Sequence, residues 1–166
     1  MAKIRFSLKL CILLLGVSFG SCAQTKSGIV KAHAYMQLNM PGTIPVGDEH
    51  KGPDTLYRVY IESRVDKKFI WSAAYIGSKT YNIVSYKATP PVNVGNLSST
   101  GEAAIVTTKK GNTLWQLNLE LTSSKSHYSK NISGLKNEVI LKFGTKKKIN
   151  FYKIKPIQEL QHELHM

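Results

Sequence analysis

Histidine and methionine gather in two regions of the chain, and both residue types can bind soft metal ions. The first region contains His33, Met36, Met40 and His50, and the second contains His162, His165 and Met166. Such donors suit copper outside the cytoplasm. His33 and Met36, however, are three residues apart in a segment that alternates like a strand, so their side chains point to opposite faces. No cysteine or carboxylate completes a recognisable ligand spacing. We therefore expect no metal site and no cofactor; a copper-binding protein is the alternative hypothesis.

Acids, bases and nucleophiles are also present, but none lies in a catalytic motif. Asp48, Glu49 and His50 are consecutive and offer groups for proton transfer. Ser98 or Ser99 with His127 would supply a nucleophile and its base. The chain has no G-x-S-x-G, no H-E-x-x-H and no glycine-rich phosphate loop. The sequence favours a binding protein over an enzyme, although an active site assembled from distant residues needs no linear motif.

The N-terminus has the pattern of an export signal. Lys3, Arg5 and Lys9 precede an apolar run from Leu10 to Val17, and small residues follow. This run is shorter than the roughly 20 residues that a membrane-spanning helix needs. We expect residues 1–21 to be a signal peptide.

The end of the signal predicts how the chain is processed. The segment Phe19-Gly20-Ser21-Cys22-Ala23 resembles the lipobox of bacterial lipoproteins, in which a small residue precedes a cysteine that becomes N-terminal and lipid-modified. The resemblance implies that Cys22 carries fatty acids that anchor the chain in a membrane. Residues 23–26 lack both an aspartate after the cysteine and an acidic run, which implies the periplasmic side of a Gram-negative outer membrane. The alternative is cleavage after Ala23, which would give a soluble periplasmic or secreted protein.

One domain follows the signal, and its core alone must hold it together. Cys11 lies inside the signal, so the mature chain has at most Cys22 and no internal disulfide. We expect residues 22–28 to be a tether. Residues 29–166 are enough for a single hydrophobic core.

The chain is strongly basic, with a formal net charge of +13, and about +10 remains without the three positive charges of the signal. An exported basic chain meets anionic lipid or glycan more often than nucleic acid. The lysines are also dispersed in short runs without interleaved stacking aromatics, so we expect no nucleic-acid partner. The alternative is that the lysines only keep strand edges and turns soluble.

The clearest secondary-structure signal is the stretch from Glu102 to Leu121. Trp115, Leu117, Leu119 and Leu121 alternate with polar residues, which is the period of a half-buried strand. Gly111-Asn112 separates this run from a β-branched run, residues 104–108, and a glycine-initiated pair is a favoured hairpin turn. This pattern predicts a hairpin from which the core grows.

Other segments share the short lengths and turn signals of strands. Strands are expected over residues 29–38, 56–62, 69–76, 81–87, 139–143 and 149–151, with long loops over 39–55 and 88–101. Hairpins are expected at Gly77-Ser78 and Gly144-Thr145. This pattern predicts an all-β antiparallel sandwich or barrel of about eight strands. The tail after Pro156 has apolar residues at helical spacing and predicts a short helix.

If every connection reverses direction, the three glycine turns and the 39–55 loop share the end opposite the tether. The candidate partner-binding residues there are Lys79, Lys109, Lys110, Lys146, Lys147 and Lys148 at the turns and Asp48, Glu49 and His50 in the loop. We expect them to dock an envelope protein or an anionic glycan through salt-sensitive contacts.

Overall fold

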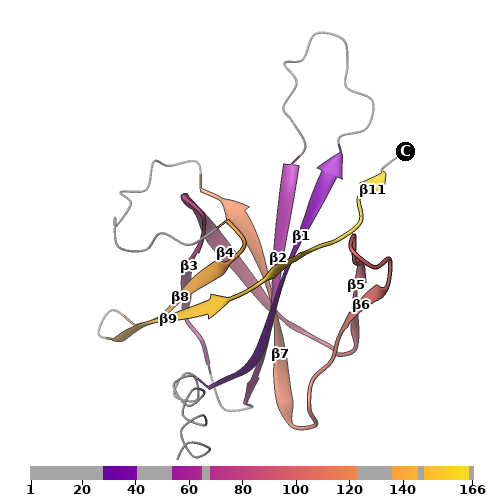
Figure 1. The fold of residues 1–166 in the computed structure, drawn as a ribbon. Helices are drawn as coiled ribbons and strands as arrows, with labels where there is room; N and C mark the ends of the chain where they lie inside the picture. Colours follow the sequence, from indigo (N-terminus) through magenta and orange to yellow (C-terminus); the bar gives the residue numbers. More distant parts are fainter. Residues whose placement is uncertain (1–27, 41–53, 65–67, 123–135, 146–147, 165–166) are drawn as a thin grey trace, which may run out of the picture.

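The computed structural model describes residues 28–40, 54–64, 68–122, 136–145 and 148–164, and this part of the chain is all-β (Figure 1). The strands are β1 (Ile29–Met40), β2 (Asp54–Arg64), β3 (Trp71–Ile76), β4 (Lys79–Ala88), β5 (Val92–Asn96), β6 (Ala103–Val106), β7 (Asn112–Leu121), β8 (Val139–Thr145), β9 (Lys148–Ile154), β10 (Ile157–Glu159) and β11 (Glu163–Leu164). The described residues form no helix long and apolar enough to cross a membrane. The expectation of an all-β fold is confirmed.

Most of the strands form one curled, mixed sheet. Its order is β10-β1-β2-β7-β4-β3-β8-β9, and β11 also pairs with β1. Only the pairs of β1 with β10 and β11 are parallel. The sheet curls into a half-barrel whose edge strand β9 approaches β1, so that Ala32 and Tyr152 line a common hollow. The described residues thus form one curled sheet and a separate two-stranded ribbon, rather than the two stacked sheets of a sandwich.

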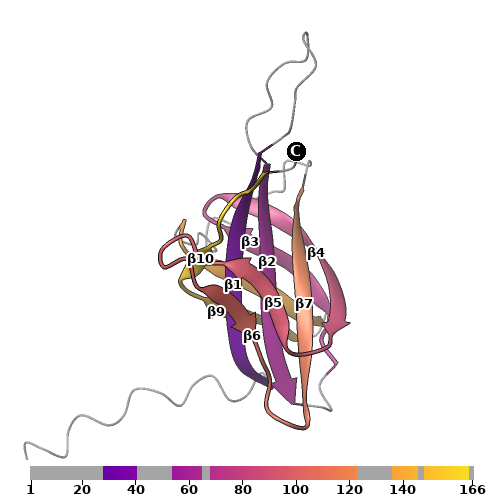
Figure 2. The same cartoon turned by 90° about the vertical axis from the view of Figure 1, so that its right-hand side faces the viewer.

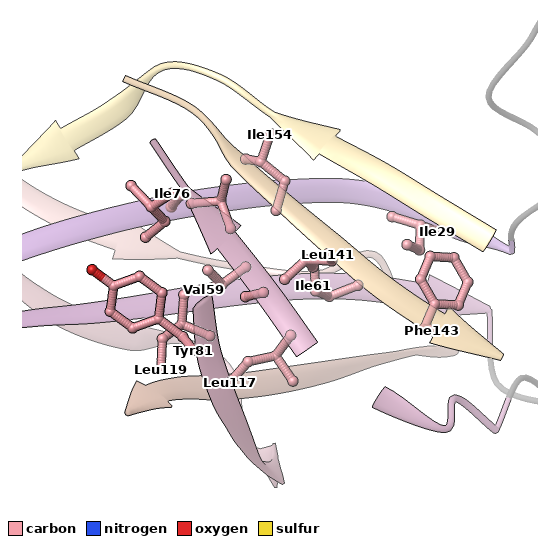
Figure 3. Packing of buried hydrophobic residues seen from close by; sticks show 13 residues of the cluster. Ile29, Val59, Ile61, Ile76, Tyr81, Leu117, Leu119, Leu141, Phe143 and Ile154 are labelled. Carbon is pink, nitrogen blue, oxygen red and sulfur yellow. The ribbon is translucent and has the colours of Figure 1, made fainter. Parts of the chain in front are cut away.

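The main core fills the concave face of this sheet (Figure 3). Alternate residues of the central strands point into it, as the period-two pattern predicts: Val59 and Ile61 from β2, and Leu117 and Leu119 from β7. Ile29, at the start of β1, lies beside Phe143 of β8. The core therefore joins the first strand of the domain to the β8–β9 hairpin.

A second cluster covers the convex face of β1, β2 and β7. Tyr35, Tyr60 and Leu114 point outward from these strands and are almost fully buried. Figure 2 shows the β5–β6 ribbon lying over β1, β2 and β7. The ribbon contributes Val94, Ala104 and Val106 to the cluster. Both faces of the middle of the sheet are consequently removed from water.

This cover explains why the expected hairpin at Gly111 does not form. β6 pairs with β5, whereas β7 pairs with β2 on one side and β4 on the other. Ala104 and Val106 pack on the face of the sheet instead of extending its edge. The alternation in β7 correctly predicts a strand. The expected pairing with residues 104–108 is wrong, because periodicity does not identify which strand lies alongside.

Two further expectations are corrected. β5 lies inside segment 88–101, which was expected to be a loop; it pairs only within the ribbon, after Pro90-Pro91. The tail after Pro156 is not a helix, because β10 and β11 pair with β1. Its buried residue Leu160 belongs to the outer cluster, and its N–H donates to the carbonyl oxygen of Met36 at 2.8 Å.

The other two hairpins form. Gly77-Ser78 joins β3 and β4 as a two-residue turn, with Gly77 at a φ of 54°. β8 and β9 also pair as expected, but Gly144 and Thr145 lie within the ladder, opposite Ile149 and Lys148. Residues 146–147, between β8 and β9, lie outside the described residues.

The first prediction tests the outer cluster. Replacing Leu160 by Ala should lower the free energy of unfolding by about 2–5 kcal/mol, because a fully buried leucine is lost and a cavity remains between the tail and the ribbon. Chemical denaturation of the purified protein measures this change. Ile105→Ala is the matched control, since Ile105 on β6 is 58% exposed and its loss should be nearly neutral. Equal effects of the two changes would contradict the placement of the tail.

Candidate functional site

The two ends of the sheet are distinct. At one end, the N–H of Arg64 donates to the carbonyl oxygen of Gly28 at 3.3 Å, and Arg64 pairs with Asn112. We call it the entry end, because the chain enters the domain there. At the other end, the distal end, Asn39 pairs with Asp54. The strands run between these two ends, so the strand register places every turn at one or the other.

The candidate lysines do not gather at one end. Lys109 and Lys110 precede β7 and lie at the entry end, as does Lys148 opposite Thr145. Lys79 lies at the distal end, where Tyr81 pairs with Leu121. The expectation of a single basic end opposite the tether is therefore wrong. The expectation assumed that every connection reverses the direction of the chain. That assumption gives β7 and β8 directions opposite to those in the structure.

Several candidates fall outside the described residues. Asp48, Glu49 and His50 lie there, and so do Lys146 and Lys147. The chain leaves β1 at Met40 and returns at Asp54, so the segment that contains Asp48, Glu49 and His50 starts and finishes at the distal end.

Two of the candidate histidines, His33 and His162, are described, whereas His127, His165 and Met166 lie outside the described residues. His33 projects from the convex face, where its ring stacks on Tyr35 at a centroid distance of 6.2 Å. Burial and the charge of Lys31 lower the pKa of His33, and Glu62 partly opposes them. Nδ1 of His162 lies 3.4 Å from the carbonyl oxygen of Leu38. Within the described ranges, no three His, Cys, Asp or Glu side chains come together as a metal site would require.

A buried carboxylate organises the entry end. Glu62 projects from the convex face of β2 and is 5% exposed. Its Oε1 accepts hydrogen bonds from the backbone N–H of Lys109 at 3.0 Å and from the side-chain amide of Asn112 at 2.5 Å. Burial alone would raise the pKa of Glu62, but these hydrogen bonds and the charges of Lys109 and Lys31 lower it below its usual value. The carboxylate thus fixes the turn before β7 to the sheet.

Charges are segregated along the strands. The basic residues at the entry end are Lys31, Arg64, Lys68, Lys87, Lys109, Lys110 and Lys148. Apart from Glu62, the acidic residues of the described part lie in the distal half: Asp54, Glu102, Glu120, Glu138, Glu159 and Glu163. The basic residues of the distal half are Arg58, Lys79, Lys136 and Lys155, and Lys153 pairs there with Glu138 at 3.0 Å. Among the described residues, the excess of positive charge therefore lies at the entry end.

A small hollow marks the seam where the half-barrel does not close. It has a volume of about 350 Å³ and is lined by Ala32, Tyr152, Lys153, Ile154 and Lys155. Burial raises the pKa of the Tyr152 hydroxyl, so this group stays neutral at physiological pH. The lining combines apolar side chains with Tyr152 and two lysines, and these groups do not define a ligand.

Sequence reasoning missed one surface at the entry end. Ile149 and Phe151 were expected to pair with core residues of β8, but they point to the convex face and are 51% and 49% exposed. A signal was present, because β9 reads KINFYKI and has apolar residues on both faces. The cluster under the β5–β6 ribbon contains no residue of β9, so the convex face of β9 stays exposed.

Comparison of the chain with protein-family models, with curated proteins and with solved structures gives no match. The arguments about function therefore rest on the residues and their geometry alone.

The second prediction concerns Glu62. Its pKa is lower in the folded chain than in the unfolded one, so it contributes stability above the unfolded pKa of about 4.5. That contribution should be lost as the pH falls through the folded pKa. Glu62→Gln should reduce the free energy of unfolding at pH 7 by about 1–3 kcal/mol and flatten its decline in acid. Denaturation curves from neutral to acidic pH measure both effects.

The control for this prediction is Glu120→Gln, because Glu120 is an exposed acid on the adjacent strand β7. This change should leave stability at pH 7 nearly unchanged. A Glu62→Gln protein as stable and as acid-sensitive as the unchanged chain would contradict the role of the carboxylate.

Proposed function

We propose that the protein is a lipid-anchored module of a Gram-negative cell envelope that binds an envelope partner. The observation that carries the proposal is Cys22, the lone cysteine at the end of an export signal, in a segment that resembles a lipobox. Residues 23–26, which follow the cysteine, lack an aspartate and an acidic run and so favour the periplasmic side of the outer membrane. In this proposal the membrane itself is the first partner, reached through the lipid.

The position of the tether supports the proposal. Gly28 is six positions after Cys22, which limits the distance between the two residues to about 20 Å even in a fully extended chain. Gly28 lies at the entry end, which is the basic end of the domain. A lipid on Cys22 would therefore hold the basic end close to the membrane, where anionic headgroups attract lysines. The charge distribution and the anchor both favour an orientation in which the entry end faces the membrane.

The distal end would then face away from the membrane and meet the second partner. It carries most of the acidic residues of the described part and is where the 41–53 segment starts and finishes. An envelope protein with a basic surface suits the distal end better than an anionic glycan does. An anionic glycan suits the lysines of the entry end, but these would lie beside the membrane.

The third prediction tests the anchor. Cys22→Ser should abolish labelling of the protein by fatty-acid analogues in its native host and should release it from the membrane fraction, because the thiol is the acceptor of the lipid. Metabolic labelling and fractionation of the envelope measure the two effects. Ser21→Ala is the control, since a small residue remains before the cysteine and labelling should persist.

Mass spectrometry of the native chain separates this proposal from ordinary export. A chain that begins at Cys22 and carries acyl groups supports it. An unmodified chain that begins at Gln24 would overturn the anchor and favour a soluble periplasmic or secreted protein.

A further inference from the structure

Three large apolar side chains are exposed on the convex face of β9 and beside the β8–β9 hairpin. Ile70, just before β3, is 60% exposed, Ile149 is 51% exposed and Phe151 is 49% exposed. Their neighbours in sequence, Trp71 and Tyr152, pack toward the core, so the exposed side chains point to the opposite face. We call Ile70, Ile149 and Phe151 the apolar patch. Exposed apolar side chains that cluster in this way are typical of binding surfaces.

Gly144 holds two members of the apolar patch in one row. Its N–H donates to the carbonyl oxygen of Ile70 at 2.8 Å, and its ladder partner on β9 is Ile149. Gly144 has a φ of 122°, and a Cβ at this position would collide with the backbone carbonyl of Lys148. A side chain here would strain the hairpin. Because Gly144 has none, Ile70 and Ile149 flank an open strip of backbone.

The apolar patch lies at the entry end and is bordered by positive charge. Phe143, next to Gly144, packs beside Ile29 at the start of β1 (Figure 3). Exposed Lys68 and Lys148 each lie within two residues of an isoleucine of the patch. Lys142 pairs with Phe151 across the ladder. Among the described acids only Glu62 lies at this end, and it is buried and hydrogen-bonded.

We propose that the apolar patch and the surrounding lysines rest on an anionic phospholipid bilayer. The inference depends on the proposed function, since the anchor at Cys22 would keep this end within about 20 Å of the membrane. Apolar side chains enter the region between headgroups and acyl chains, and lysines pair with the phosphates around them. Each lysine near an anionic surface strengthens binding roughly fivefold. The domain then lies on the membrane in one orientation instead of moving freely on its tether.

The experiment places a reporter at the apolar patch of the processed, lipidated protein. In that protein Cys22 is acylated, so Ile149→Cys supplies a free thiol for an environment-sensitive fluorophore. The protein is reconstituted into vesicles of phosphatidylethanolamine and phosphatidylglycerol that contain a lipid with a nitroxide on its acyl chain. The nitroxide should quench the reporter several-fold, and phosphatidylcholine vesicles should give much weaker quenching.

Leu121→Cys is the matched control, because Leu121 is 59% exposed at the distal end. A reporter there should remain unquenched in both kinds of vesicle. Lys109→Gln with Lys110→Gln should lower the ratio of docked to free domains by roughly tenfold or more. The quenching at residue 149 should fall accordingly. The same change at Lys79 and Lys136, in the distal half, should leave it unaltered.

Two outcomes would overturn the docking proposal while leaving the anchor intact. In the first, the protein floats with the vesicles but its reporter at residue 149 is no more quenched than that at residue 121. In the second, the reporter enters an apolar environment but escapes the nitroxide, which would mean that a second copy of the chain covers the patch. Failure of the anchor is distinguishable, because the protein would then lack the acyl mass and would not float with uncharged vesicles.

Discussion

The middle of the sheet has apolar side chains on both faces, and the rest of the structure depends on burying both. Curling of the sheet covers the concave face, where Val59, Ile61, Leu117 and Leu119 meet the β8 side of the core. Curling cannot cover Tyr35, Tyr60 and Leu114 on the convex face. The β5–β6 ribbon and Leu160 cover these three side chains instead. Burial of apolar area is the main force that stabilises a domain without a disulfide.

This constraint explains how the pairing departs from local expectation. A strand after Gly111 could have continued a hairpin, but residues 103–106 are needed as the cover of the convex face. The tail after Pro156 could have formed an amphipathic helix, but β10 instead completes the edge beside β1 and brings Leu160 under the ribbon. In each case contacts between distant segments outweigh a local preference.

Much of the local structure could be predicted from the sequence. The strands with period-two alternation, the two-residue turn at Gly77 and the opposite faces of His33 and Met36 follow from local rules. The candidate site could not be predicted in the same way. Which end a lysine occupies depends on the direction and partner of its strand, and one wrong pairing at Gly111 misplaces Lys109 and Lys110. The exposure of Ile149 and Phe151 depends on β9 being an edge strand, which no local pattern shows.

The entry end unites the features that bear on function. Glu62 fixes the turn that carries Lys109, and Gly144 keeps Ile70 and Ile149 in one row. These contacts make the basic and apolar surface part of the rigid sheet, so a lipid at Cys22 would anchor an oriented domain. The exposed distal end would then be presented to the periplasm in a fixed direction. Orientation by the membrane would thus link the fold to binding of a partner.

The most direct test of this account is the orientation of the whole domain on a bilayer. Nuclear magnetic resonance of the lipidated protein in nanodiscs with paramagnetic headgroups reports the distance of each backbone amide from the membrane. The account predicts strong broadening at Ile70, Lys110 and Ile149 and none at Lys79, Glu120 and Glu163. Uniform broadening, or a gradient that is strongest at the distal end, would contradict it.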